Sequence, residues 1–134
     1  MPIVRRVTYF KMIVPNRPGQ GARVLNVLHQ AGINLLAFSG FPHRGGAQMD
    51  FIPAKPAAFR KVARKNKWKI AAPKRAFLVR GADRVGAGAK LMSKLAAKRI
   101  NVSLSRSEHP RRYGAILWVS PGQYSKAARV LGAR

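Results

Sequence analysis

The chain has 134 residues, 47% of them hydrophobic, which suffices for one packed domain or two very small ones. It carries 27 lysine and arginine residues against three acidic ones, a net charge of +24 spread over both halves of the sequence. The lack of cysteine excludes disulfides and thiolate chemistry, and no apolar run approaches the roughly 20 residues of a membrane span. Without a recognisable secretory signal at the N-terminus, we expect a soluble, cytoplasmic protein.

The first half of the chain alternates strand-like and helix-like segments. β-Branched and aromatic runs indicate strands, and apolar residues recurring every three or four positions indicate a helix. Proline at the start of the second helix suits its first turn. The expected elements are a strand at 7–14, a helix from Val24 to Ala31, strands at 33–41 and 47–53, a helix at 56–65, and a candidate fourth strand at 67–70.

The second half repeats this order and then ends too soon for a fourth strand. Its expected elements are a strand at 74–80, a helix through Leu91 and Leu95, strands at 100–107 and 113–120, and a helix led by Pro121. Pro73 is a suitable junction between the halves. The sequence therefore predicts an α+β protein of two ferredoxin-like βαββαβ repeats, 1–72 and 73–134, with the second truncated. We expect antiparallel sheets with the helices on one face.

One long sequence motif occurs twice in the chain. "VPNRPGQGARVLNVLHQAGIN" at 14–34 aligns without gaps to "GADRVGAGAKLMSKLAAKRIN" at 81–101. The Asn-Arg-Pro-Gly turn, the leucine-containing helix and the Gly-Ile-Asn that opens the next strand resemble the ACT domain. The second copy has Val85 in place of the usual proline and Arg99 in place of the usual glycine. Taken together, the copies are similar to the small stand-alone two-ACT proteins of bacteria.

The resemblance implies a non-enzymatic regulatory module. ACT domains bind amino acids or other small metabolites, usually where two ACT units meet. In serine-sensing members the ligand contacts correspond here to Val14, Asn16 and Asn34. Val14 replaces a histidine of that set, as Gly81 does in the second copy, and this argues against serine. The implied ligand-binding residues are Asn16, Pro18, Gly19, Gln20, Gly21 and Asn34 in the first copy, and Asp83, Gly86 and Asn101 in the second.

Physical chemistry supports a carboxylate at this turn. The first backbone N–H groups of a helix lack intrahelical partners and carry a partial positive charge. Glycines at 19 and 21 permit close approach of a ligand. In the second copy, Asp83 places an anion near the expected carboxylate and predicts a weaker or purely structural site. Alternatively, the glycines only permit the turn, and Asn34 only bonds neighbouring backbone.

The basic charge supports a second interpretation, nucleic-acid binding. Helix 56–65 is amphipathic, and its expected outer face carries Arg60, Lys61, Arg64 and Lys65. An anionic membrane surface is a third interpretation of such a face. The run "RRYGAILW" at 111–118 partly fits an RNA-recognition signature, with Tyr113 and Trp118 in place and Phe77 on a neighbouring strand. Ala115 replaces a central aromatic of that signature, which argues against RNA recognition.

No catalytic or metal-binding pattern emerges. His29, His43 and His109 are scattered, and three dispersed acids cannot complete a metal site. Few acids also leave few groups for general acid–base chemistry, so we expect no enzyme and no cofactor. A truncated second repeat leaves an open sheet edge, and open edges invite pairing. We therefore expect a homodimer, or an edge covered by the N-terminal "MPIVRR".

Overall fold

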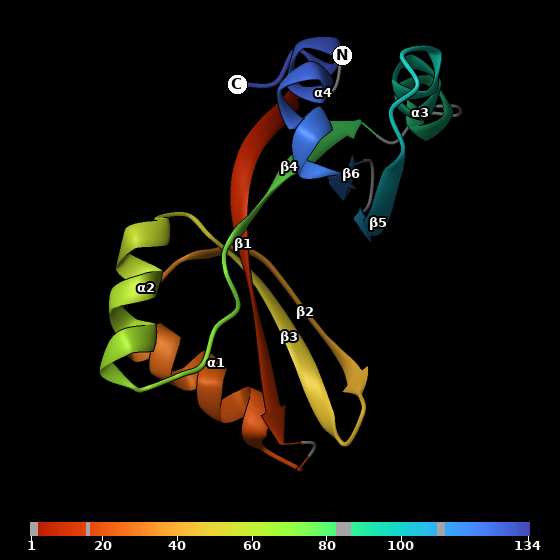
Figure 1. The fold of residues 1–134 in the computed structure, drawn as a ribbon. Coiled ribbons are helices and arrows are strands. Elements are labelled where there is room, and N and C mark those ends of the chain that lie inside the picture. The colour runs from red at the N-terminus through yellow and green to blue at the C-terminus, as the bar shows by residue number, and fades with distance from the viewer. Residues whose placement is uncertain (1–2, 16, 83–86, 110–111) are drawn as a thin grey trace. The chain divides into compact units, whose positions relative to one another are not determined.

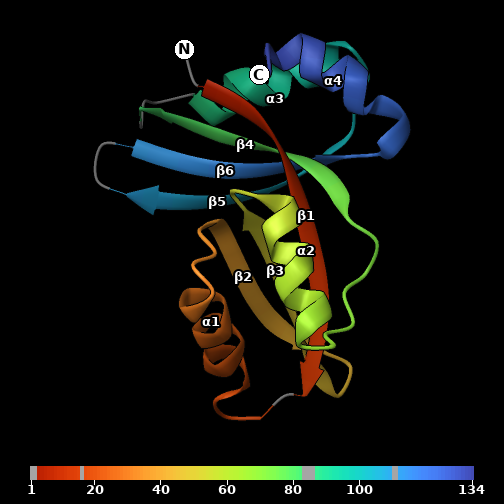
Figure 2. The same cartoon turned by 90° about the vertical axis from the view of Figure 1, so that its left-hand side faces the viewer.

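The computed structural model describes residues 3–15, 17–82, 87–109 and 112–134. The chain divides into two compact units (Figures 1 and 2). One unit is Thr8–Lys74, and the other combines Met1–Val7 with Arg75–Arg134. Strand β1 (Ile3–Pro15) therefore contributes its first residues to one unit and the remainder to the other.

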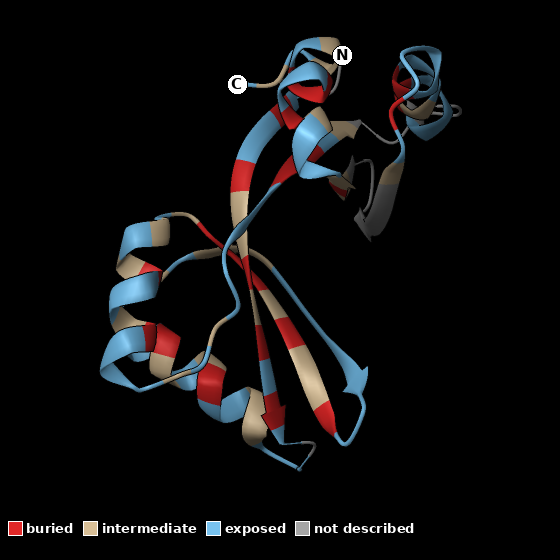
Figure 3. Cartoon of the chain, in the orientation of Figure 1, coloured by how far each residue is buried: buried red, intermediate tan, exposed pale blue. Residues whose placement is uncertain are grey.

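The Thr8–Lys74 unit is an antiparallel sheet with two helices on one face (Figure 1). Its strands lie in the order β2-β3-β1. After β1 come α1 (Gln20–Gln30), β2 (Leu35–His43), β3 (Gly46–Pro53) and α2 (Pro56–Lys65). Figure 3 marks buried residues in red on both helices and on strands β1 and β3 of this unit. Phe59 of α2 is buried, with its ring centroid 4.8 Å from Phe10 and 5.4 Å from Phe51. These aromatic contacts join helix to sheet and stabilise the core beyond simple area burial.

The second unit has the same kind of layering, with helices over one sheet face (Figure 2). Its strand order is β1-β4-β6-β5, where β1 contributes its N-terminal residues. The ring of Tyr124 stacks on Phe77 with centroids 4.5 Å apart, and its hydroxyl donates to the carbonyl of Ala76 at 3.0 Å. The remaining elements are β4 (Lys74–Ala82), α3 (Ala87–Ala97), β5 (Val102–His109), β6 (Arg112–Val119), a 3-10 turn (Pro121–Gln123) and α4 (Tyr124–Leu131).

The N-terminal residues cover the sheet edge beside β4, as one of the two sequence-based alternatives predicted. Val4 is buried in the core of this unit. The N–H of Arg6 donates to the carbonyl of Arg134 at 2.9 Å, and the N–H of Arg134 donates to the carbonyl of Val4 at 3.0 Å. The beginning and the end of the sequence are thus held together by backbone hydrogen bonds.

Helices α1 and α3 end in the same way. After α1, the N–H of Ile33 donates to Leu28 at 3.0 Å across Gly32, which has φ of 73°. After α3, the N–H of Ile100 donates to Leu95 at 3.0 Å across Arg99, which has φ of 56°. This is the Schellman cap, whose left-handed residue is usually glycine. The Gly-Ile-Asn and Arg-Ile-Asn sequences are therefore capping segments that turn the chain into the next strand.

Several expected boundaries differ from the structure, and α1 begins at Gln20, four residues before Val24. Strand β1 begins at Ile3, earlier than the apolar run indicated, because its first residues pair within the second unit. The expected fourth strand at 67–70 is reduced to one bridge between Ile70 and Met12. Pro121 opens a 3-10 turn, and the α-helix starts only at Tyr124. Within the ranges that the structure describes, no helix is both long and apolar enough to cross a membrane.

Candidate ligand-binding site

The turn before α1 is shaped by Gly19. This residue has φ of 86°, a left-handed conformation that favours glycine, and it caps α1 without a side-chain hydrogen bond. The N–H of Gln20 bonds to the carbonyl of Arg17 at 3.3 Å. A Cβ at Gly21 would meet only the Met49 Cε at 3.7 Å, an ordinary contact. The backbone conformation therefore explains why residue 19 is glycine, whereas packing does not require glycine at residue 21.

The predicted ligand residues do not all gather at one place within the unit. Gln20 begins α1 and Asn34 follows its end, and 11 helical residues at about 1.5 Å each separate them by about 16 Å. Asn34 is exposed, and its carbonyl accepts a hydrogen bond from Ala54 at 2.9 Å. Pro18 and Asn101 are also exposed. Asn16, Asp83 and Gly86 lie outside the described residues.

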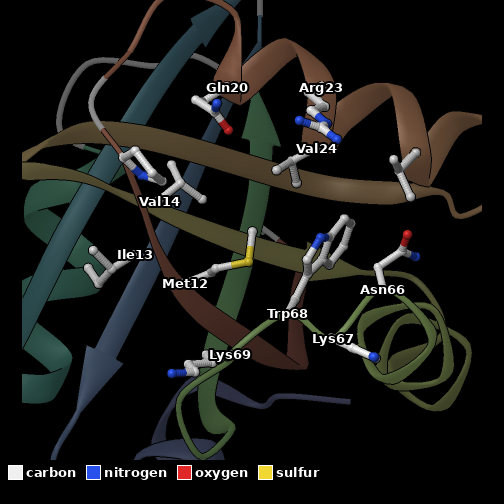
Figure 4. Close-up of a pocket in the computed structure, with 12 residues that line it drawn as sticks. Met12, Ile13, Val14, Gln20, Arg23, Val24, Asn66, Lys67, Trp68 and Lys69 are labelled. Carbon is white, nitrogen blue, oxygen red and sulfur yellow. The ribbon is translucent and has the colours of Figure 1, made fainter.

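A pocket of about 440 Å³ lies beside the first turns of α1 (Figure 4). It is built entirely from the Thr8–Lys74 unit. Of the predicted ligand-binding residues that the structure describes, only Gln20 lines it, and Val14 joins it from the end of β1. The lining residues are Met12, Ile13, Val14 and Pro15 of β1, Gln20, Arg23, Val24 and Val27 of α1, and Asn66, Lys67, Trp68 and Lys69 after α2.

The segment after α2 reaches the pocket through another Schellman cap. Lys67 takes the left-handed position with φ of 56°, and the N–H of Trp68 donates to Ala63 at 2.9 Å. The Asn66 side chain also donates to the carbonyl of Val62 at 2.9 Å. Trp68 is thereby held against the core of this unit while remaining partly exposed. The pattern of "KWKI" indicated a candidate strand and gave no indication of a place in the pocket. The aromatic residue flanked by two lysines is the sequence signal for it.

The pocket is positively charged. Its charged lining residues are Arg23, Lys67 and Lys69, and none of the described lining residues is acidic. The whole sequence offers only three acids, so little in the chain neutralises these cations. Such a site favours an anion and disfavours a ligand's ammonium group.

The basic face of α2 is arranged as its spacing predicted. Phe59 and Ala63 are buried, whereas the four cations of the outer face are exposed. The guanidinium of Arg60 lies 5.5 Å from the centroid of the Phe10 ring. The exposed cations of this face are Arg60, Lys61, Arg64 and Lys65.

The second aromatic residue that the RNA-recognition interpretation needs is inaccessible. Phe77 is fully buried and stacked on Tyr124, so it is not available to stack on a base. Ala115 is buried as well. The side chain of Tyr113 lies outside the described residues. Among the side chains that are described, no group of histidine and acidic residues is placed to hold a metal ion.

Comparison with known proteins gives the fold. No protein-family model matches the sequence, and no curated protein matches it either. A crystal structure of a protein from Bacteroides thetaiotaomicron superposes with a TM-score of 0.83 at 18% identity, covering 96% of this chain and 88% of that one. The ligand-free regulatory subunit of aspartate kinase from Thermus thermophilus gives 0.64 at 16% identity, covering 98% and 94%.

The regulatory subunit of aspartate kinase from Thermus flavus gives a TM-score of 0.62 at 20% identity, with the same coverage of 98% and 94%. The chain has an ACT-like α+β fold. This agrees with the resemblance that the Asn-Arg-Pro-Gly and Gly-Ile-Asn segments carry. At these identities the likeness establishes architecture alone.

Proposed function

We propose that the protein is a non-enzymatic regulatory module of two ACT-like repeats that binds a small carboxylate-bearing metabolite, an amino acid. The fold that it shares with aspartate kinase regulatory subunits supports this proposal. The helix ends support the repeat: glycine or a basic residue takes the left-handed cap position after each of the four helices. These residues are Gly32, Lys67, Arg99 and Gly132.

The single observation that carries the site is the open start of α1. Gly19 caps the helix with no side-chain hydrogen bond and no acidic residue in the first turn, so the positive helix end is free of a protein anion there. A ligand carboxylate fits this position. The turn at Pro18–Gly21 is therefore the proposed carboxylate-binding segment.

A small ligand that contacts both Gln20 and Asn34 needs these two residues from two copies of the chain. Gln20 and Asn34 lie at opposite ends of α1, too far apart for one small ligand. Asn34 is exposed and its side chain is accessible to a second copy. We propose a homodimer in which the turn of one chain faces Asn34 of the other.

Calorimetry with each of the twenty amino acids tests this function. A ligand present at 100 times its Kd should stabilise the fold by about 2.7 kcal/mol. Asn34→Ala should abolish this stabilisation without unfolding the protein, because the side chain is exposed. Asn101→Ala is the matched control, since it removes an exposed asparagine from the same place after α3 and should retain binding. The absence of heat with all twenty amino acids would rule out the amino-acid proposal.

The exposed face of α2 favours nucleic-acid binding as a second candidate function. Four cations lie on one surface of ten helical residues, which suits non-specific contact with phosphates. Replacing all four with glutamine should weaken duplex DNA binding and flatten its salt dependence. Affinity that is insensitive to salt would contradict this candidate.

A further inference from the structure

We propose that the pocket beside Trp68 binds a nucleoside phosphate, with the base against the indole and the phosphate against Arg23. The pocket shares Gln20 with the amino-acid site proposed above, but the side chains that would hold the nucleotide are Trp68 and Arg23, which that site does not use. The size, the lining and the charge of the pocket support this assignment.

The dimensions suit a small organic ligand. A volume of about 440 Å³ falls within the roughly 300–1,000 Å³ of ligand pockets. Its floor is apolar, because Met12, Val14 and Val24 are buried side chains of the core. Polar and charged groups surround this floor. A ligand with a flat apolar part and a charged part matches that division.

Trp68 provides the surface for the flat part. Its backbone is fixed by the cap at the end of α2, where its N–H bonds to Ala63 at 2.9 Å. Its side chain is only partly buried, and Figure 4 shows the indole directed toward α1 between Met12 and Asn66. An indole held in this way is a stacking platform, and every nucleobase has a flat face that suits it.

Arg23 selects the charged part, because its planar guanidinium pairs with phosphate through two hydrogen bonds. Lys67 and Lys69 point to opposite sides of Trp68 in Figure 4, and they add positive charge around the pocket. An amino acid is a poor match here, because its ammonium group would meet this positive charge and no acid is among the described lining residues. Inorganic phosphate would satisfy the cations but leave the indole without a partner. A nucleoside phosphate uses both halves of the pocket.

Fluorescence provides a direct readout. The sequence has two tryptophans, so Trp118→Phe leaves Trp68 as the sole reporter. Adenosine 5′-monophosphate titrated at physiological salt should quench this fluorescence saturably. Adenosine and inorganic phosphate should each bind at least about tenfold more weakly, because each lacks one half of the interaction.

Two triple variants separate a defined site from general charge attraction. Arg23→Gln with Lys67→Gln and Lys69→Gln should weaken the nucleotide by at least about tenfold, since the charged hydrogen bonds are lost. Arg60→Gln with Lys61→Gln and Arg64→Gln is the matched control. It removes the same charge from an exposed face of the same unit. It should change the affinity by less than about twofold, because exposed charges at a distance are screened by salt.

Each outcome decides the proposal. Saturable quenching by the mononucleotide that requires the pocket cations supports it. Quenching by a short single-stranded oligonucleotide alone also supports it and assigns the nucleotide to a polymer. Equal weakening in the two triple variants, or no quenching by either probe, overturns it. Asn34→Ala should leave this quenching intact, so failure here and failure of the amino-acid proposal are distinguishable.

Discussion

Replacing Arg99 with glycine should stabilise the protein by about 1 kcal/mol. Arg99 takes the left-handed position after α3, with φ of 56°. Its N–H donates to Ala96 at 2.9 Å and the next N–H, of Ile100, donates to Leu95 at 3.0 Å, so the cap fixes this backbone conformation. A residue with a Cβ is strained there, and glycine is not.

The magnitude follows from two opposing terms. A left-handed conformation costs a non-glycine residue about 1–2 kcal/mol. Glycine in turn makes the unfolded chain more flexible, and this offsets about 0.4–1 kcal/mol of the stabilisation gained by relieving that strain. The mirror change at α1, Gly32→Ala, should destabilise the fold by a similar amount. No atom lies within 4 Å of a Cβ built at Gly32, so this loss is conformational and not steric.

Urea unfolding of three proteins measures the effect. Arg99→Ala is the matched control, because it removes the same exposed charge and side chain as Arg99→Gly while keeping the Cβ. We expect Arg99→Ala to stay within about 0.5 kcal/mol of the parent, as exposed substitutions do. Equal unfolding free energies for the alanine and glycine variants would refute the reasoning.

Two further predictions concern packing and titration. Gly46→Ala should cost about 1–3 kcal/mol in urea unfolding, because the new Cβ would lie 2.8 Å from the Val14 carbonyl oxygen. Gly40→Ala, whose nearest contact would be 3.7 Å away, is the control, and equal losses would contradict this explanation. Burial raises the pKa of Tyr124 above its ordinary 10.0, although Arg75 and Arg6 partly oppose this. The raised pKa means that the neutral phenol stabilises the fold below pH 10, and that this contribution is lost as pH rises through the folded pKa. Between about pH 9 and pH 11 the unfolding free energy of the parent should therefore fall more than that of Tyr124→Phe. Parallel profiles of unfolding free energy against pH for the two proteins would contradict this prediction.

The order and type of the elements were accessible from sequence. Alternation and helical spacing are local properties, and they placed a strand or helix at every expected position except 67–70, where the structure has a single bridge. The N-terminal extension of β1 was not predicted. The segment "IVRR" at 3–6 carries two exposed arginines, and it becomes a strand only by pairing beside β4. The single bridge at Ile70 likewise depends on a tertiary partner, Met12, which no local pattern reveals.

The candidate sites were predicted less completely. The glycine turn and Gln20 follow from motif and helix-end chemistry. The place of Trp68 in the pocket could not be predicted from the motif. It depends on the cap after α2, where Lys67 takes a left-handed conformation that is usual for glycine. The burial of Phe77 was also not predicted. The same strand pattern fits an aromatic residue on the surface and an aromatic residue buried against Tyr124 of α4.

Strand β1 also sets an order of events during synthesis. Its first residues lack the β4 partner until Ala82 has been translated, and they lack Arg134 until all 134 residues have been translated. At about 5–20 residues per second, these intervals are on the order of 10 s. An unpaired strand on a ribosome invites pairing with other nascent chains. Arg5 and Arg6, both exposed in the folded protein, place like charges on this segment and oppose such pairing.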